Sequence, residues 1–130
     1  MKIRVEKGLP IAELRIDYGK KSMIFNNVLI DTGCAVTIFD TDMMAKIGLI
    51  IDFSHGRPRR MYGVGGKGEV CIEQKVNGLS IDHQRLDDFN LQLGMVQEMY
   101  GFDGLVGLDF MLKTGMNIDF KSLKVNYKNN

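Results

Sequence analysis

The amino-acid sequence predicts a mainly β domain with one or two short helices. Fifteen glycines and only two prolines are spread over 130 residues. Short segments rich in Val, Ile and Phe lie between glycine or asparagine pairs, a pattern typical of many short strands joined by turns. Since 45% of the residues are apolar, the chain can supply a hydrophobic core. We therefore expect residues 1–130 to form one domain, because domains commonly contain roughly 100 to 200 residues.

Strands in the first part of the chain are predicted from alternation and apolar runs. Residues 11–18 alternate apolar and polar side chains, which is the period of a half-buried strand. Residues 23–30 form a second segment that runs directly into Asp31. A third strand, residues 36–39, is expected to leave the turn that contains Asp31.

A short helix and a long hairpin are expected next. Thr41 can cap a helix through residues 42–47, and Gly48 stands where a left-handed residue would end it. Residues 57–76 are expected to form a hairpin, and its tip, residues 63–68, is rich in glycine. This pattern predicts two long strands joined by a flexible connection.

The Asn77 and Gly78 pair is the strongest short hairpin signal in the chain, because Asn-Gly suits a two-residue turn between antiparallel strands. We expect this pair to join a strand ending at Val76 to one beginning at Leu79. A further strand is expected at residues 89–96.

The C-terminal residues predict a helix followed by a hairpin. Residues 108–113 suit a short helix that Gly115 would stop. Residues 116–120 and 123–127 are short segments rich in apolar side chains that can pair across residues 121–122.

Composition and charge exclude several classes of partner. The 17 basic and 16 acidic side chains leave a net charge of +1, so no broad field would attract nucleic acid or an anionic membrane. The first residues lack the apolar core of a secretion signal, and no apolar run approaches the ~20 residues that span a bilayer. Cys34 and Cys71 are too few for a disulfide framework and would stay reduced in the cytosol. We therefore predict a soluble, cytoplasmic protein.

The segment most informative about chemistry is residues 28–39, in which an Asp-Thr-Gly turn lies between two strongly apolar stretches. Burial disfavours a charged carboxylate unless it is paired or hydrogen-bonded. The position of Asp31 between two apolar stretches therefore indicates a specific role for its carboxylate. Gly33 has no side chain, so its N–H can approach a carboxylate closely. Thr32 offers a hydroxyl that can donate a hydrogen bond while its methyl group packs.

A second informative segment is residues 101–111, in which Leu105, Val106 and Gly107 precede the predicted helix. Together the two segments resemble the retropepsin-like aspartic peptidases, particularly the bacterial single-domain members. The glycine-tipped hairpin, Met61 to Val70, resembles the flap that closes over substrate in that family. The resemblance extends from about Ile11 to Val125 and implies a retropepsin-like acid protease β-barrel.

The resemblance implies an aspartic endopeptidase in which Asp31, Thr32 and Gly33 are the catalytic residues. Aspartic peptidases use two carboxylates that share a proton, and this chain contains a single Asp-Thr-Gly triplet. Asp103 lacks a following Thr and Gly, and Asp109 lacks the framing strands of a second half-site. The resemblance therefore implies a homodimer acting on a peptide or protein substrate, with no metal and no organic cofactor.

The resemblance also implies a set of substrate-binding residues in the flap, beyond the turn and in the second segment: Tyr62, Gly63, Val64, Gly65, Gly66, Ala35, Leu105 and Val106. Two departures accompany the matches. Cys34 and Ala35 follow the triplet where family members commonly have Ala and then Ser or Asp. Leu108 and Asp109 follow Gly107 where viral members have Arg and Asn. The alternative function is a catalytically silent dimerisation or peptide-binding module of the same fold.

Other patterns in the sequence have simpler interpretations. The basic run Arg57 to Arg60 is interpreted as a solvated strand edge, with nucleic-acid binding as the alternative. The two histidines and two cysteines do not have zinc-ligand spacing. Cys34 could sense oxidants if its thiolate were exposed and stabilised, or could be a small core residue. The methionines are expected to fill core gaps, with Met95, Met99 and Met111 as candidates to line an apolar groove.

Overall fold

The computed structural model describes residues 2–62 and 68–127. The described part of the chain contains ten strands and three short helices. In chain order these are β1 (Arg4–Glu6), β2 (Leu9–Tyr18), β3 (Lys21–Ile30), β4 (Ile38–Asp40), α1 (Thr41–Ala45), β5 (Arg57–Tyr62), β6 (Gly68–Ile81), β7 (Gln84–Gly94), α2 (Val96–Tyr100), β8 (Gly104–Val106), α3 (Leu108–Thr114), β9 (Met116–Asp119) and β10 (Lys124–Tyr127).

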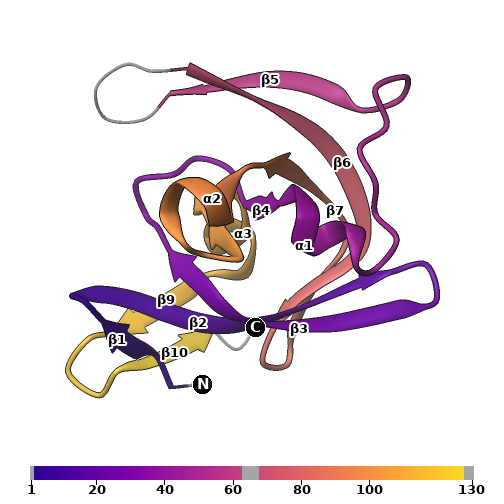
Figure 1. Cartoon of the computed structure of the whole chain (residues 1–130). Helices are drawn as coiled ribbons and strands as arrows, with labels where there is room; N and C mark the ends of the chain where they lie inside the picture. The colour runs from indigo at the N-terminus through magenta and orange to yellow at the C-terminus, as the bar shows by residue number, and fades with distance from the viewer. Residues whose placement is uncertain (1, 63–67, 128–130) are drawn as a thin grey trace.

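Most strands belong to a sheet that closes on itself (Figure 1). The strand order is β1-β2-β3-β8-β4-β7-β6-β5, and an additional pairing joins β2 to β6. Strands β2, β3, β8, β4, β7 and β6 therefore form a closed barrel, while β1 and β5 lie outside the ring. The pairs β3–β8 and β4–β7 are parallel, and the others are antiparallel. The predicted mainly β barrel is confirmed.

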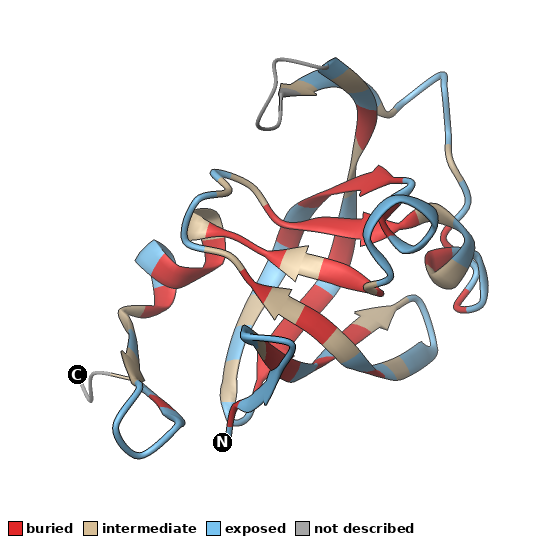
Figure 2. Ribbon diagram, turned by 60° about the vertical axis from the view of Figure 1, so that its left-hand side comes forward, coloured by how far each residue is buried: buried red, intermediate tan, exposed pale blue. Residues whose placement is uncertain are grey.

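The barrel interior is filled by side chains that alternate inward along the strands, seen as red bands in Figure 2. Phe25 and Phe39 meet edge to face at 5.3 Å between ring centroids. Phe89 meets Phe110 of α3 in the same way at 6.3 Å. Edge-to-face aromatic pairs contribute about 1 kcal/mol beyond the area they bury, so the Phe89–Phe110 contact helps hold α3 against the barrel.

The C-terminal predictions are confirmed. Helix α3 ends at Gly115, whose φ of +64° is the left-handed conformation that favours glycine. Strands β9 and β10 then form a separate two-stranded sheet in which Ile118 pairs with Val125. In the first half, Gly48 has the expected left-handed φ of +86°. Helix α1 nevertheless ends at Ala45, with Lys46 as its C-cap, and so stops before the predicted residue 47.

The predicted hairpin turn at Asn77 and Gly78 is wrong. Both residues lie inside β6, and the turn falls after Ile81, where Asp82 has a φ of +54°. Gly78 is buried and pairs with Asp17 on one side and Asp87 on the other. A side chain on Gly78 would overlap the Arg85 guanidinium, so this glycine permits close packing within a central strand and makes no turn.

Other boundaries differ because tertiary contacts decide them. Strand β7 begins at Gln84 and ends at Gly94, earlier than the predicted residues 89–96, because the turn precedes it. Strand β4 begins at Ile38, two residues later than predicted. Helix α1 is capped by Asp40, whose carboxylate accepts the Met43 N–H at 3.2 Å, and Thr41 is its first residue.

Helix α2 was not predicted from the sequence. It is a single short turn that follows β7 and ends at Gly101 with a φ of +79°. The second oxygen of Asp40 accepts the Gln97 N–H at 2.9 Å, so one carboxylate caps α1 and holds the start of α2. Among the described residues, no helix combines the length and apolar character needed to cross a bilayer.

Candidate active site

Two apolar strands place Asp31. It directly follows Ile30, the last residue of β3, and β3 runs parallel to β8 with Ile30 beside Val106. The Asp31 N–H donates to the Val106 carbonyl at 3.0 Å. Ile30 and Val106 are buried whereas Asp31 is partly exposed. The carboxylate therefore lies where the barrel core meets solvent.

The Asp-Thr-Gly turn folds back on the carboxylate it carries. The Gly33 N–H donates to Asp31 Oδ1 at 2.9 Å, and the Cys34 N–H donates to the Asp31 carbonyl at 3.2 Å. A side chain on Gly33 would lie only 3.2 Å from Asp31 Oδ1. Thr32, Gly33 and Ala35 are exposed, so a peptide or a second chain can reach the turn.

A buried threonine and a carboxylate far apart in sequence brace this turn. Thr37, fully buried, donates its hydroxyl to Asp109 Oδ1 at 2.7 Å and its N–H to Asp109 Oδ2 at 2.9 Å. The same hydroxyl accepts the Gly107 N–H at 3.1 Å. We call this set of three residues the Thr37–Asp109 clamp. Bonds to a charged acceptor contribute about 1.5 to 3 kcal/mol each, so the clamp fixes β4 against the start of α3.

Backbone bonds continue the connection between the turn and α3. The Leu108 N–H donates to the Cys34 carbonyl at 2.8 Å, and the Asp109 N–H donates to the Ala35 carbonyl at 3.2 Å. A Cβ atom on Gly107 would lie 2.6 Å from the Cys34 carbonyl oxygen. Only glycine allows the two segments to come this close.

We expect Thr37→Val to lower the free energy of unfolding by about 2 to 3 kcal/mol, because the Gly107 N–H and one Asp109 bond would lose their buried partner. Urea denaturation followed by circular dichroism would measure the change. Thr37→Ser, which keeps the hydroxyl, is the matched control and should keep most of the wild-type free energy of unfolding. An unfolding midpoint in Thr37→Val equal to that of the wild type would contradict the clamp.

A small apolar cluster, the site cluster, lies beside the turn. Its buried members are Ile38, Cys71 and Val96, and its partly buried members are Cys34, Val36, Met61, Phe102 and Leu105. The predicted substrate-binding residue Leu105 therefore lies in partly exposed apolar surroundings next to the turn. Val106 is fully buried in the main core and supports the turn through its carbonyl.

Both thiols belong to the site cluster, and neither is activated. Burial raises the pKa of Cys34, opposed by its hydrogen bond to the Val36 carbonyl and increased further by the charges of Asp31 and Asp109. Burial likewise raises the pKa of Cys71. A thiol is nucleophilic as its thiolate, so these shifts favour the core-residue interpretation of Cys34 over oxidant sensing.

Asp103 has a structural role. It is buried, and its carboxylate accepts the Asn27 N–H at 3.2 Å. Its backbone joins β3 to β4, because its N–H donates to the Asn27 carbonyl and its carbonyl accepts the Asp40 N–H. Burial raises the pKa of Asp103, and the nearby Asp40 charge acts in the same direction. The Asp103 carboxylate thus holds Asn27, just as the Asp109 carboxylate holds Thr37.

The structure separates the methionine candidates. Met95 and Met99 are exposed at the start of α2 and within it, so they remain candidates to line a groove. Met111 is buried in the main core, and its predicted groove position is wrong. Of the histidines, His55 contacts Asp52, and His83 packs against the Tyr127 ring.

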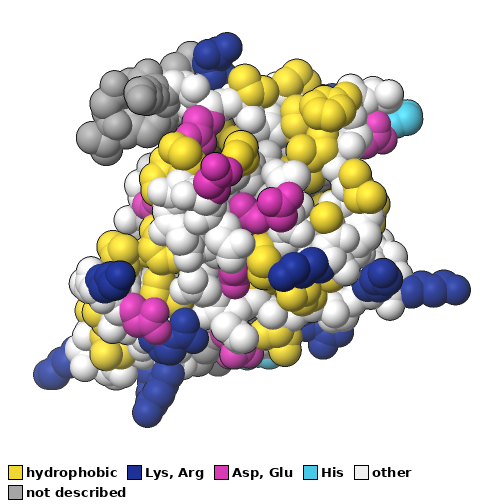
Figure 3. Space-filling model, viewed as in Figure 1, with side chains coloured by type: hydrophobic (Ala, Val, Ile, Leu, Met, Phe, Trp, Pro, Cys, Tyr) yellow, Lys and Arg dark blue, Asp and Glu magenta, His cyan; other side chains and the backbone are white. Residues whose placement is uncertain are grey.

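The predicted flap is described only in part. Strands β5 and β6 form its two arms, with Met61 paired to Glu69 and Tyr62 to Gly68. The predicted substrate-binding residues Gly63, Val64, Gly65 and Gly66 lie outside the described residues. Figure 3 shows hydrophobic side chains gathered on the upper part of the visible face, around this hairpin. Val70 of β6 is exposed, as are Ile50 and Phe53 in the segment that precedes β5.

Local sequence patterns did not connect Thr37 with Asp109. They are 72 residues apart, and each is a polar residue next to an apolar segment. That placement could have indicated a buried hydrogen bond, because a polar side chain that is buried needs a hydrogen-bond partner. Asp40, which holds two helices, carries the same signal and was also missed.

Comparison with known proteins supports the fold. No protein-family model matches the chain, and no curated protein matches it. Among solved structures, a retropepsin-like aspartic protease from Rickettsia conorii superposes with a TM-score of 0.64 and 18% identity over 95% of this chain and 86% of that one. The retroviral protease-like domain of Ddi1 from Leishmania major superposes with a TM-score of 0.56 and 17% identity, over 93% and 88% of the two chains. The closed barrel, the two strands that frame Asp31 and these superpositions together show that the chain has the retropepsin-like fold.

Proposed function

We propose that this chain is one half of an aspartic endopeptidase and contributes Asp31 to a catalytic dyad completed by a second identical chain. One observation carries the proposal above the others. Asp31 lies at the open end of two core strands of a retropepsin-like fold, with its Oδ1 held by the Gly33 N–H at 2.9 Å. Such an arrangement orients a carboxylate toward solvent, and within residues 2–62 and 68–127 its second oxygen is not engaged by the Gly33 bond that holds Oδ1.

The proposed mechanism needs two carboxylates with opposite protonation states. An ionised Asp deprotonates a water molecule, and a protonated Asp donates a hydrogen bond to the scissile carbonyl. Two like charges at close distance split their pKa values, so a symmetric pair can hold one proton between them. The attack forms a tetrahedral intermediate, and a proton returned to the leaving amine completes the hydrolysis. These steps use side chains and water alone.

A two-fold symmetric homodimer would supply the second carboxylate, because its axis can bring Asp31 and its symmetry mate face to face. The exposure of Thr32 and Gly33 supports this assembly, since the turn is open to another chain. Thr32 would then donate across the axis, and Gly33 would continue to hold the carboxylate. Residues 1–130 would form the single domain of each protomer.

The substrate would bind as an extended strand between the turn and the flap, which is a common way for peptides to add to a β protein. Ala35 and Leu105 would contact its side chains, because one is exposed and the other partly exposed beside the turn. Tyr62, Gly63, Val64, Gly65 and Gly66 would cover the peptide backbone, and Val106 would support the site from the core. No metal would take part.

Binding of a pepstatin-type transition-state mimic tests the proposal. An assembled dyad should bind its hydroxyl tightly, so the melting temperature of the dimer should rise with inhibitor concentration. The oligomeric state should be recorded in the same buffer by analytical ultracentrifugation. Digestion of a mixed peptide library, with activity falling steeply on dilution below the dimer dissociation constant, would complete the test.

The alternative, a catalytically silent peptide-binding module, is favoured by one feature, the replacement of the usual residues after the triplet by Cys34 and Ala35. A proven dimer whose melting temperature does not change with any inhibitor concentration, and which cleaves no library peptide, would replace the protease proposal with this one.

A further inference from the structure

The flap hairpin has two chemically different faces. Antiparallel partners share a face, and here Arg59 pairs with Cys71 and Arg60 with Val70. Cys71 is buried in the site cluster, and Met61, two residues from Arg59, packs against the same cluster. Side chains alternate along a strand, so Arg59 lies on the face of the flap that is turned toward the catalytic turn.

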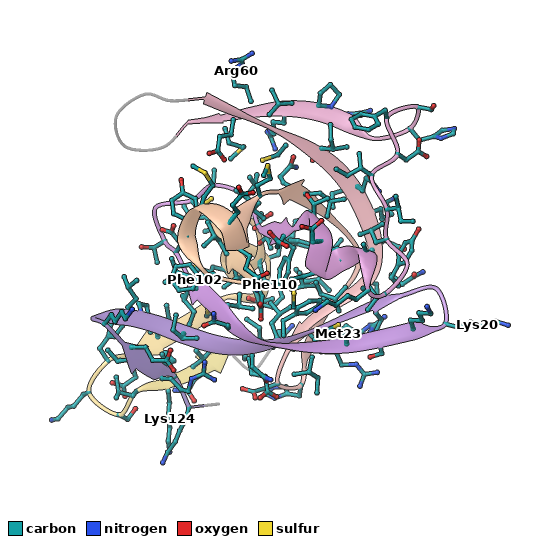
Figure 4. The ribbon with its side chains drawn as sticks, viewed as in Figure 1. Lys20, Met23, Arg60, Phe102, Phe110 and Lys124 are labelled. Carbon is teal, nitrogen blue, oxygen red and sulfur yellow. The ribbon has the colours of Figure 1, made fainter. Side chains whose placement is uncertain are left out.

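Arg60 lies on the opposite face. Its partner Val70 is 57% exposed, and Figure 4 shows the Arg60 side chain projecting away from the barrel. The arginines of the basic run therefore do not form one continuous surface, as a phosphate backbone would require. The alternation assigns Arg59 to the inner face of the flap and Arg60 to its outer face.

The charge of Arg59 is only loosely compensated. A carboxylate oxygen of Glu73 lies 4.0 Å from Arg59 Nη1, and the Arg59 side chain is 53% exposed. The same Glu73 oxygen accepts the Gln92 Nε2–H at 3.1 Å. Exposed pairs of this kind contribute little to stability, because solvent screens both charges. A carboxylate that reached the guanidinium with two parallel bonds would be held better.

The position of Arg59 along the strand says which part of a peptide it could contact. Strands rise about 3.3 Å per residue, so Arg59 lies about 7 Å farther from the flap tip than Met61 does. A bound extended peptide has the same two-residue period. A peptide side chain two positions away from the one that packs on Met61 would therefore lie beneath Arg59.

Resting on the endopeptidase function proposed above, we propose that Arg59 is a specificity-determining residue that selects an acidic side chain, Glu or Asp, in the peptide substrate. The selected residue lies two positions from the residue that contacts Met61, away from the scissile bond. Glu73 competes with the substrate carboxylate for the same guanidinium and so limits the preference.

The test uses a parent peptide chosen from the library and a series in which Glu or Gln occupies each of four positions on either side of the cleaved bond. Wild-type dimer should show, at one position, a kcat/KM about threefold to tenfold higher for Glu than for Gln, the range expected for one solvent-accessible charge-assisted contact. Arg59→Gln should bring this ratio to about 1. Arg60→Gln, the matched control on the outer face, should leave it unchanged. Glu73→Gln should increase it, because its amide cannot compete as an anion.

The outcomes separate this inference from the proposed function. If the peptides are cleaved but the Glu preference is the same in the wild type and Arg59→Gln, or is lost equally in Arg60→Gln, the assignment of Arg59 is wrong while the protease stands. If no peptide is cleaved, fluorescence anisotropy of the same labelled peptides decides the matter. Binding that prefers Glu in the wild type and not in Arg59→Gln would support Arg59 in a binding module, and equal binding of both peptides would overturn it.

Discussion

Replacing Asp31 by Asn is expected to lower kcat/KM for any library peptide by about 10²-fold to 10⁴-fold, the range attributed to a positioned acid or base. Asn cannot ionise, so a dimer of the variant has neither a base for the water nor a shared proton. Its side-chain oxygen can still accept the Gly33 N–H that holds Asp31 at 2.9 Å in the wild type. The fold and the dimer should therefore survive.

Initial rates with the selected peptide, at matched protein concentrations and with the oligomeric state recorded, are the measurement. Asp88→Asn is the control, because Asp88 is an exposed residue with a φ of +50° that Asn adopts readily. It should retain full activity. Equal cleavage by the wild type and Asp31→Asn would indicate a contaminating protease and remove Asp31 from the mechanism.

Replacing Gly107 by Ala is expected to lower the free energy of unfolding by about 3 kcal/mol, the upper part of the usual range for overpacking. The added methyl group would lie 2.6 Å from the Cys34 carbonyl oxygen and 2.7 Å from that of Val36. Both are backbone atoms, which cannot rotate away. The φ of Gly107 is −107°, a value open to alanine, so the whole cost comes from lack of space.

Urea denaturation followed by circular dichroism gives this free energy, with an unchanged m-value as the check on two-state unfolding. Gly8→Ala is the contrasting variant. Nothing lies within 4 Å of a Cβ at Gly8, but its φ is +77°, so it should lose only about 1 to 2 kcal/mol through backbone strain. If Gly107→Ala unfolds at the wild-type midpoint, α3 does not approach the Asp-Thr-Gly turn as closely as the Gly107 geometry requires.

The Gly107 variant also links stability to the proposed function. In the wild type the Leu108 N–H, at the start of α3, donates to the Cys34 carbonyl at 2.8 Å. The added methyl group would push this carbonyl away from α3. Any displacement of that carbonyl moves the turn that carries Asp31. A site that depends on two facing carboxylates tolerates little misplacement, so a folded fraction of this variant should be less active per molecule.

Local patterns in the sequence determined much of this protein. The apolar segment ending at Ile30 predicted the strand that leads into Asp31, and residues 108–113 with Gly115 predicted α3 and its stop. The terminal hairpin followed from two short segments rich in apolar side chains. These features depend on the spacing of apolar residues and on the backbone freedom of glycine within a few residues. Both are properties of the local sequence and need no distant contact. Resemblance of the two motifs was enough to expect a retropepsin-like barrel.

Only the tertiary structure decided the role of residues whose partners are distant. Gly78 has the sequence of a turn, yet it lies in a strand because β2 and β7 pair with it from both sides and Arg85 packs over it. Asp40 became the cap of one helix and the support of another. Thr37 and Asp109 meet across 72 residues. The local sequence shows only that such a side chain is polar or small. Which group becomes its hydrogen-bond partner depends on the distant parts of the chain that bury it.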